Sequence, residues 1–241
     1  MRDLLPMSRT PASPLPPTGV ILPAGGSGQR LGGTPKQFRL LGDAPVLVQT
    51  ARVFARHPGL AAVVVVAPEA SVDDVRALLD QYEVEALVVA GGLSRAASVE
   101  RGLEALPEHV ETVLVHDAVR PFVSADLIAR VLAAVRAHGA AAAATRVADT
   151  LRRAQADRFG PTVKRDGLWA MQTPQGAHRT LLARAYAFGH ASRDGTPTDE
   201  AGLLGLAGIP VHVVEGDTRN IKVTTPGDWA LAEALWPAWV A

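Results

Sequence analysis

The stretch that decides the fold is Val20-Ile-Leu-Pro23 followed by Ala24-Gly-Gly-Ser-Gly-Gln-Arg-Leu-Gly-Gly-Thr-Pro-Lys36. Its first residues are apolar at successive positions, which is typical of a strand buried on both faces of a parallel sheet. Glycines after such a strand let the backbone approach an anion closely and turn its amides toward phosphate oxygens. The stretch therefore predicts an open α/β sheet with an anion site at the end of its first strand.

The rest of the chain repeats this alternation of apolar runs and longer amphipathic segments, which indicates successive βα units. Further strands are expected at 62–66, 86–90, 112–116 and 210–214. Helices are expected at 45–56, 72–81, 95–106, 125–138, 180–189, 199–206 and 227–236. Ser124 and Thr198 precede two of these helices and are predicted to cap them.

The stretch 148–175 breaks the rhythm, being rich in Arg, Thr and Gly with a polar alternating run, Thr162-Val-Lys-Arg165. It predicts an extended β-arm that protrudes from the domain. The run Ala140–Ala144 is interpreted as a buried strand of small residues. We expect one domain at 19–241, preceded by a proline-rich, disordered leader at 1–18 without the continuous apolar segment of a signal peptide.

Composition excludes several classes of protein. Lys plus Arg and Asp plus Glu both number 24, so a domain-wide basic field for nucleic acid is absent. There is no cysteine, which excludes disulfides and thiolate chemistry and is compatible with a reducing cytosol. No stretch approaches the ~20 apolar residues that span a bilayer. The expectation is a soluble, cytoplasmic enzyme that binds neither nucleic acid nor membrane.

The glycine-rich loop fits neither common nucleotide motif. Gly33 is not followed by the lysine of a P-loop. A dinucleotide fingerprint needs glycine where Leu31 stands and an acid about twenty residues on, and 45–51 has none. A surface turn with scattered cations is one alternative, but Arg30 and Lys36 flank the amide-rich loop and favour a triphosphate.

Two further segments place charged side chains at the carboxyl ends of strands, which in a parallel sheet lie along one rim with the glycine-rich loop. In His116-Asp-Ala-Val-Arg-Pro121, Asp117 could hold a hydroxyl group or a metal and Arg120 a phosphate; a simple Asp–Arg pair bracing the loop is the alternative. His116 is interpreted as structural rather than as a base. In Asn220-Ile-Lys-Val-Thr224, the apolar neighbours of Lys222 indicate an ammonium group aimed at a specific partner, against the alternative of a solvated lysine.

The segment Gly91-Gly-Leu-Ser-Arg-Ala-Ala-Ser98 runs a glycine turn into a helix. Ser98 and the amides of Gly91 and Gly92 could read the edge of a base, although by itself the segment is an ordinary helix start. Because parallel strands end at one rim, the four segments together predict a cationic site for polyanionic substrates, and a nucleotidyl transfer from a nucleoside triphosphate to a phosphorylated alcohol.

Six motifs occur in order: Pro23-Ala-Gly-Gly-Ser-Gly-Gln-Arg-Leu, Thr34-Pro-Lys-Gln, His116-Asp-Ala-Val-Arg-Pro121, Thr173-Pro-Gln, Thr198-Asp-Glu-Ala and Asn220-Ile-Lys-Val-Thr224. Over about 19–236 the chain resembles the 2-C-methyl-D-erythritol 4-phosphate cytidylyltransferase family. The resemblance implies a Rossmann-like nucleotidyltransferase fold and a homodimer whose β-arms cross. It also implies transfer of CMP from CTP to methylerythritol phosphate, with Mg²⁺ held mainly by the CTP phosphates and Asp117 as a further candidate ligand.

The resemblance also implies roles for individual residues. Arg30 and Lys36 would hold the triphosphate and stabilise the transition state, while Lys222 and Arg165 would position the acceptor phosphate. These four are the candidate catalytic residues. The candidate substrate-binding residues are Pro23, Ala24, Gly25, Gly26, Gly28, Gly91, Gly92, Ser98, Asp117, Ala118, Arg120, Thr150, Thr173 and Thr198.

One position departs from the family pattern: Leu93 stands where an acid or polar residue is common. The change is harmless to cytosine selectivity if only the backbone touches the base, and matters if the side chain does. Two other functions stay open at this point. One is a cytidylyltransferase for ribitol 5-phosphate or another polyol phosphate, and the other is a non-catalytic nucleotide-binding protein.

Overall fold

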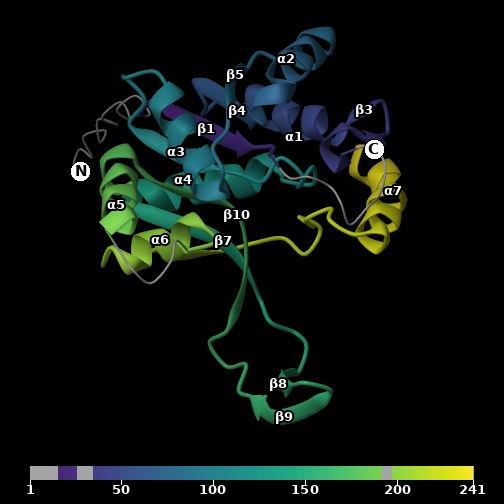
Figure 1. The fold of residues 1–241 in the computed structure, drawn as a ribbon, viewed down its shortest axis with the longest axis vertical. Helices are drawn as coiled ribbons and strands as arrows, with labels where there is room; N and C mark the ends of the chain where they lie inside the picture. The colour runs from purple at the N-terminus through teal and green to yellow at the C-terminus, as the bar shows by residue number, and fades with distance from the viewer. Residues whose placement is uncertain (1–15, 26–34, 192–196, 241) are drawn as a thin grey trace, which may run out of the picture.

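The computed structural model describes residues 16–25, 35–191 and 197–240 (Figure 1). In this part of the chain a seven-stranded sheet has the order β11-β7-β10-β6-β1-β4-β5. Its strands are β1 (Thr18–Pro23), β4 (Ala62–Ala67), β5 (Leu87–Ala90), β6 (Thr112–Val115), β7 (Ala140–Arg146), β10 (Trp169–His178) and β11 (His212–Glu215). Only β10 runs antiparallel to its neighbours, so the predicted, mostly parallel α/β sheet is confirmed.

Helices cover both faces of the sheet, as predicted. They are α1 (Val46–Ala55), α2 (Val72–Gln81), α3 (Arg95–Ala105), α4 (Ala125–His138), α5 (Arg179–Ala191), α6 (Glu200–Leu206) and α7 (Pro226–Val240). Residues of α1, α2 and α4 pack on one face and residues of α3, α5 and α6 on the other. Val20 and Leu22 of β1 point into the first core and Ile21 into the second, because successive side chains of a strand alternate.

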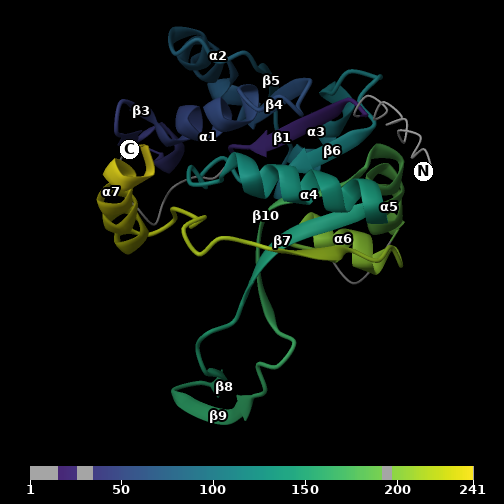
Figure 2. The same cartoon turned by 180° about the vertical axis from the view of Figure 1, so that it is seen from behind.

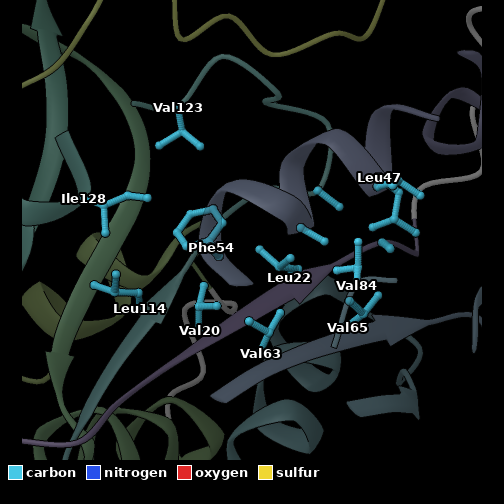
Figure 3. Packing of buried hydrophobic residues seen from close by; sticks show 14 of the residues in the cluster. Val20, Leu22, Leu47, Phe54, Val63, Val65, Val84, Leu114, Val123 and Ile128 are labelled. Atoms are coloured by element: carbon cyan, nitrogen blue, oxygen red, sulfur yellow. The ribbon is translucent and has the colours of Figure 1, made fainter. Parts of the chain in front are cut away.

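The first core is centred on the aromatic ring of α1 (Figure 3). Phe54 is fully buried and lies among aliphatic side chains of the sheet and of α4, including Val20, Leu114 and Ile128. Five consecutive alanines of β7 are also buried, which confirms the interpretation of that run.

A third, smaller core holds α7 against the start of the chain's first hairpin. Short strands β2 (Leu40–Leu41) and β3 (Ala44–Pro45) follow the 3₁₀ turn η2 (Lys36–Phe38), and a second such turn, η3 (Glu69–Ser71), precedes α2. Phe122 and Trp229 are buried in this third core together with Val223. The core therefore joins the loop after β6 to the segment that carries Lys222.

The predicted β-arm exists, but its bounds were wrong at the C-terminal side. The hairpin of β8 (Leu151–Gln155) and β9 (Arg158–Val163) projects away from the body in both views (Figures 1 and 2). Residues 172–175, assigned to the arm by the sequence, instead lie in β10 and are buried in the central sheet. Gln175 pairs with Val115 of β6 and Ala142 of β7, and the residues just before it lie at a break in the register between β7 and β10.

Two local predictions need correction. Ser124 caps α4 as predicted, with its hydroxyl oxygen accepting from Leu127 N. Thr198 does not cap α6; Asp199 does, because its carboxylate accepts from Gly202 N. The last helix begins at Pro226 and ends at Val240, four residues beyond the predicted end. In the described part of the chain, no helix is both long and apolar enough to cross a membrane.

Candidate active site

The predicted rim exists: the segments that follow strands β1, β5, β6 and β11 converge on one pocket of about 390 Å³, and residues at the end of β4 also line it. The pocket is lined by Pro23, Ala24, Gly25, Lys36, Gln37, Ala67, Pro68, Gly91, Gly92, Leu93, Ser94, Arg95, Ser98, Asp117, Val119 and Lys222. The carboxyl end of the sheet thus brings nine of the eighteen predicted site residues together in this pocket. Gly26, Gly28 and Arg30 lie outside the described residues.

The start of the first loop is held by backbone and side-chain hydrogen bonds. Ala24 N donates to Val66 O at 2.8 Å, and Gln37 Nε2 donates to Ala24 O at 3.1 Å. These bonds fix the chain as it leaves β1 and tie it to the turn η2, which presents Lys36 to the pocket. Lys36 and the first loop are therefore placed as one unit.

The glycine turn before α3 is compact because no side chain fits there. A Cβ at Gly91 would lie 2.8 Å from Ser98 Oγ, and one at Gly92 would lie 2.5 Å from the Ala97 Cβ. Gly92 N donates to Ser98 Oγ at 3.1 Å, and Ser98 Oγ donates to Ser94 O at 2.8 Å. Ser98 thus organises the turn that the sequence predicted to read a base.

Gly92→Ala is expected to raise the KM for the nucleotide on the order of tenfold, since overpacking such a site costs roughly 1–3 kcal/mol. The added methyl group would displace the turn from the Ala97 side chain and so disturb the pocket wall. Steady-state kinetics at varied nucleotide concentration measures the effect. Gly205→Ala is the control, because a Cβ there in α6 meets nothing within 4 Å; an unchanged KM in Gly92→Ala would contradict the role of the turn.

His116 is structural, as predicted. It is fully buried, its Nε2 lies 3.1 Å from Arg120 O and its Nδ1 lies 3.0 Å from Thr173 Oγ1. Because a carbonyl oxygen only accepts, Nε2 carries the proton and donates it to Arg120 O. Nδ1 then accepts a hydrogen bond from the Thr173 hydroxyl. The same hydroxyl oxygen accepts from Asp117 N at 3.1 Å. Burial lowers the pKa of His116 to about 4, which keeps the ring neutral.

Thr173 was predicted to contact the substrate, but its side chain is almost fully buried and its hydroxyl lies behind Asp117. The ladder between β7 and β10 is interrupted between Met171 and Gln175. At that interruption Asn220 Nδ2 donates to Thr173 O at 2.7 Å. In this structure Thr173 therefore orients the backbone of Asp117 and anchors the segment before Lys222.

Asp117 lies at the centre of a cluster of cations. Its carboxylate is 2.8 Å from Lys222 Nζ, 3.5 Å from Arg95 Nη2 and 3.6 Å from Arg120 Nε. Burial alone would raise the pKa of Asp117, but Lys222, Arg95 and Arg120 more than offset it and hold that pKa well below its usual range. Asp117 is therefore an ionised carboxylate that braces positive groups rather than an acid or base.

Lys222 is aimed into the pocket by its neighbours. Val223 is fully buried in the third core, its N donates to Val119 O at 2.9 Å, and Ile221 packs on the same core. The side chain between them faces the opposite way and reaches Asp117. The predicted specific partner of Lys222 is thus an observed ion pair.

Arg120 and Ala118 support the loop from inside. Arg120 is buried, and its Nη1 donates to Asn220 O at 2.7 Å. Ala118 is buried too, and its carbonyl accepts from Thr50 Oγ1 at 3.0 Å. Of the two interpretations of Arg120, a phosphate contact or a pair with Asp117 that braces the loop, the structure shows the second.

Besides the buried Thr173, Ala118 and Arg120, three further predicted residues do not line this pocket. Arg165 and Thr150 are exposed at the base of the β-arm, where a guanidinium N–H of Arg165 donates to Ala148 O. Thr198 is exposed one residue before the cap of α6. None of the three lines the pocket of its own chain.

Sequence reasoning missed the Arg95–Glu200 pair. Arg95 lines the pocket and donates both terminal nitrogens to the buried Glu200 carboxylate, at 2.8 and 3.0 Å. Both residues stood inside quoted motifs, but they are 105 positions apart. No local pattern marks the pair, because the burial of Glu200 and its contact with Arg95 exist only in the folded chain.

A divalent metal would find few protein ligands here. Among the described residues, no group of three His, Cys, Asp or Glu side chains could hold one. Asp117 is the acid among the described pocket residues, and its oxygens face cations. The donor set fits a metal whose ligands come mainly from a bound triphosphate.

A glycine turn and a cluster of cations at the carboxyl end of an α/β sheet are typical of an enzyme that binds a nucleotide or another phosphorylated substrate. The family model for 2-C-methyl-D-erythritol 4-phosphate cytidylyltransferase matches residues 18–237. The chain belongs to this family and is therefore a nucleotidyltransferase.

Several relatives support the assignment along nearly the whole chain. The 2-C-methyl-D-erythritol 4-phosphate cytidylyltransferase of Salinibacter ruber is 52% identical over 225 residues, covering 91% of this chain and 93% of that protein. That of Deinococcus radiodurans is 46% identical, covering 93% and 92%. The crystal structure of the Thermus thermophilus enzyme superposes with a TM-score of 0.76 at 35% identity, covering 92% and 99%.

Proposed function

We propose that the chain transfers CMP from CTP to 2-C-methyl-D-erythritol 4-phosphate, giving 4-diphosphocytidyl-2-C-methyl-D-erythritol and pyrophosphate. The observation that carries the proposal is the pocket itself. Lys36 and Lys222 line it together with the glycine turn of Gly91 and Gly92. A nucleotide bound against that turn would extend its phosphates toward both ammonium groups.

The chemistry needs no general base. The acceptor phosphate is already ionised at neutral pH, so the barrier lies in bringing two anions together and in the charge that develops on the α-phosphate. Lys36 and Arg30 would stabilise that charge, and Lys222 would hold the acceptor phosphate. His116, neutral and fully buried, takes no part in proton transfer.

The proposed cofactor is Mg²⁺, held mainly by the CTP phosphates. When bound, such an ion neutralises charge on the triphosphate and favours the departure of pyrophosphate. Asp117 is the carboxylate that could add a ligand to the metal. It also forms an ion pair with Lys222 at 2.8 Å. Lys36 and Lys222 would complement the metal by meeting the phosphates from the protein side.

Selectivity for the base is assigned to the backbone of the turn and to Ser98. The side chain of Leu93 is fully exposed at the rim of the pocket. Ser98 is buried, already holds Gly92 N and lies at the inner wall. The departure at Leu93 from the polar residue common in the family is then compatible with cytosine selectivity.

The proposal includes a homodimer whose β-arms cross. Apolar side chains on and beside the arm are exposed, with Phe159 at 80% and Met171 at 42%. An exposed β-hairpin with apolar residues needs cover or a strand partner. Crossed arms would give that cover and would carry Arg165 and Thr150 to the partner's pocket. The cytoplasm is the proposed compartment, since a chain without cysteine suits reducing conditions.

The substrate pair is tested by product analysis. CTP and 2-C-methyl-D-erythritol 4-phosphate with Mg²⁺ are expected to release pyrophosphate, and ATP or GTP to do so far more slowly. A site that hydrogen-bonds one base leaves polar groups unpaired with another, which costs on the order of 10²-fold or more. Equal turnover of all triphosphates would contradict cytosine selectivity, and turnover only with ribitol 5-phosphate would change the acceptor.

A further inference from the structure

A buried ion pair lies next to the pocket and has no part in the proposed chemistry so far. The Glu200 side chain is 3% exposed in the first turn of α6, and its two oxygens accept from the two terminal nitrogens of Arg95 at 2.8 and 3.0 Å. Burial raises the pKa of Glu200, and the Arg95 guanidinium opposes that shift. The fork fixes the plane of the guanidinium as well as its position.

Arg95 continues from Glu200 to the cation cluster. Its Nη2 also lies 3.5 Å from Asp117 Oδ1, while the other oxygen of Asp117 is 2.8 Å from Lys222 Nζ. The residues Glu200, Arg95, Asp117 and Lys222 thus form a chain of alternating charge. It links the start of α6, the start of α3, the loop after β6 and the segment before α7.

We infer that Arg95 and Glu200 are positioning residues, which set the orientation of Asp117 and through it aim Lys222 at the acceptor phosphate. The inference rests on the proposed function and adds to it. Because Arg95 is paired mainly with Glu200, the Asp117 carboxylate is shared among Arg95, Arg120 and Lys222. Without Glu200, the Arg95 charge falls on Asp117 alone and draws its carboxylate away from Lys222.

A direct role for Arg95 as a phosphate-binding cation is the competing interpretation, since its side chain is 29% exposed at the pocket. Both of its terminal nitrogens, however, already donate to Glu200. A phosphate contact requires a charge near the ligand, which lysine also supplies, whereas positioning requires the two-pronged fork that lysine lacks. The two roles are therefore separable by substitution.

The kinetic test compares Glu200→Gln, Arg95→Met, Arg95→Lys and the double variant Arg95→Met/Glu200→Gln with the unmodified enzyme. Each single change is expected to raise the KM for the acceptor on the order of tenfold, the scale of coupling between residues in contact. The KM for CTP should stay within about twofold of the unmodified value. The double variant should lose no more than one single variant, because the pair acts as a unit. Arg95→Lys should resemble Arg95→Met.

The matched control is an exposed arginine–carboxylate pair on α2. Arg76 and Asp73 lie 2.7 Å apart with side chains 50% and 94% exposed, so Arg76→Met/Asp73→Asn should leave both KM values unchanged. Multiplicative effects in the double variant, or full activity in Arg95→Lys, would overturn the inference. Equal rises of KM for CTP and the acceptor would do so too, since they would indicate general damage.

A structural measurement keeps the inference testable without turnover. If the unmodified enzyme fails to use the substrate pair, the proposed function is wrong before any variant is compared. A crystal structure of Glu200→Gln without ligands, an isosteric change suited to folding, is expected to show Asp117 and Lys222 separated beyond about 4 Å. Retention of the pair at its present 2.8 Å would overturn the positioning role whatever the activity.

Discussion

Lys36→Met is expected to lower kcat on the order of 10²-fold or more, the scale of removing one preorganised donor from an active site. The turn η2 presents Lys36 to the pocket, and Gln37 ties that turn to the loop leaving β1. The ammonium group is thus placed before the substrate binds and needs no rearrangement during the reaction. A charge that acts on the developing α-phosphate should affect kcat more than KM.

Rapid-quench measurement of the first turnover separates the chemical step from product release and tests this directly. Arg76→Met is the control, since it removes one positive charge from an exposed position on α2. Arg30→Met, outside the described residues, is expected to behave as Lys36→Met does. Near-normal kcat with a raised KM for CTP in Lys36→Met would show that the first loop only binds.

Much of the fold could be predicted because its signals are local. The buried run Val20–Pro23 and the alanine run of β7 are continuous in sequence, and α2 and α4 have the predicted bounds. The pocket followed from one rule, that parallel strands end at the same rim. Lys222 could be predicted to have a specific partner because its neighbours are apolar and alternate with it.

What the sequence did not reveal depends on contacts between distant segments. Residues 169–175 of the antiparallel strand β10 were assigned to the arm because their polar side chains find partners only in segments distant in sequence. Gln175 Nε2, for example, donates to Asp199 Oδ2 at 2.9 Å, just before α6. The same carboxylate group caps α6, where a threonine looked equally suitable. The Arg95–Glu200 pair required knowledge that α3 and α6 meet on one face of the sheet.

The proposal that two copies of the chain share each active site gives the second large expected effect. Arg165 lies on the arm and does not line the pocket of its own chain. If crossed arms in a dimer carry it to the partner's pocket, each site takes Lys36 from one chain and Arg165 from the other. Lys36→Met and Arg165→Met enzymes should then each be nearly inactive alone, the second chiefly through a raised KM for the acceptor.

Unfolding the two variants together and refolding them at equal concentration should recover activity to about 25% of the unmodified enzyme. Random pairing makes half of the dimers mixed, and each mixed dimer has one site with both lesions and one site with neither. If each site lay within one chain, every site of a mixed dimer would carry a lesion and nothing would recover. Native mass spectrometry confirms the mixed dimers, so their presence without recovered activity would rule out a site shared between two copies of the chain.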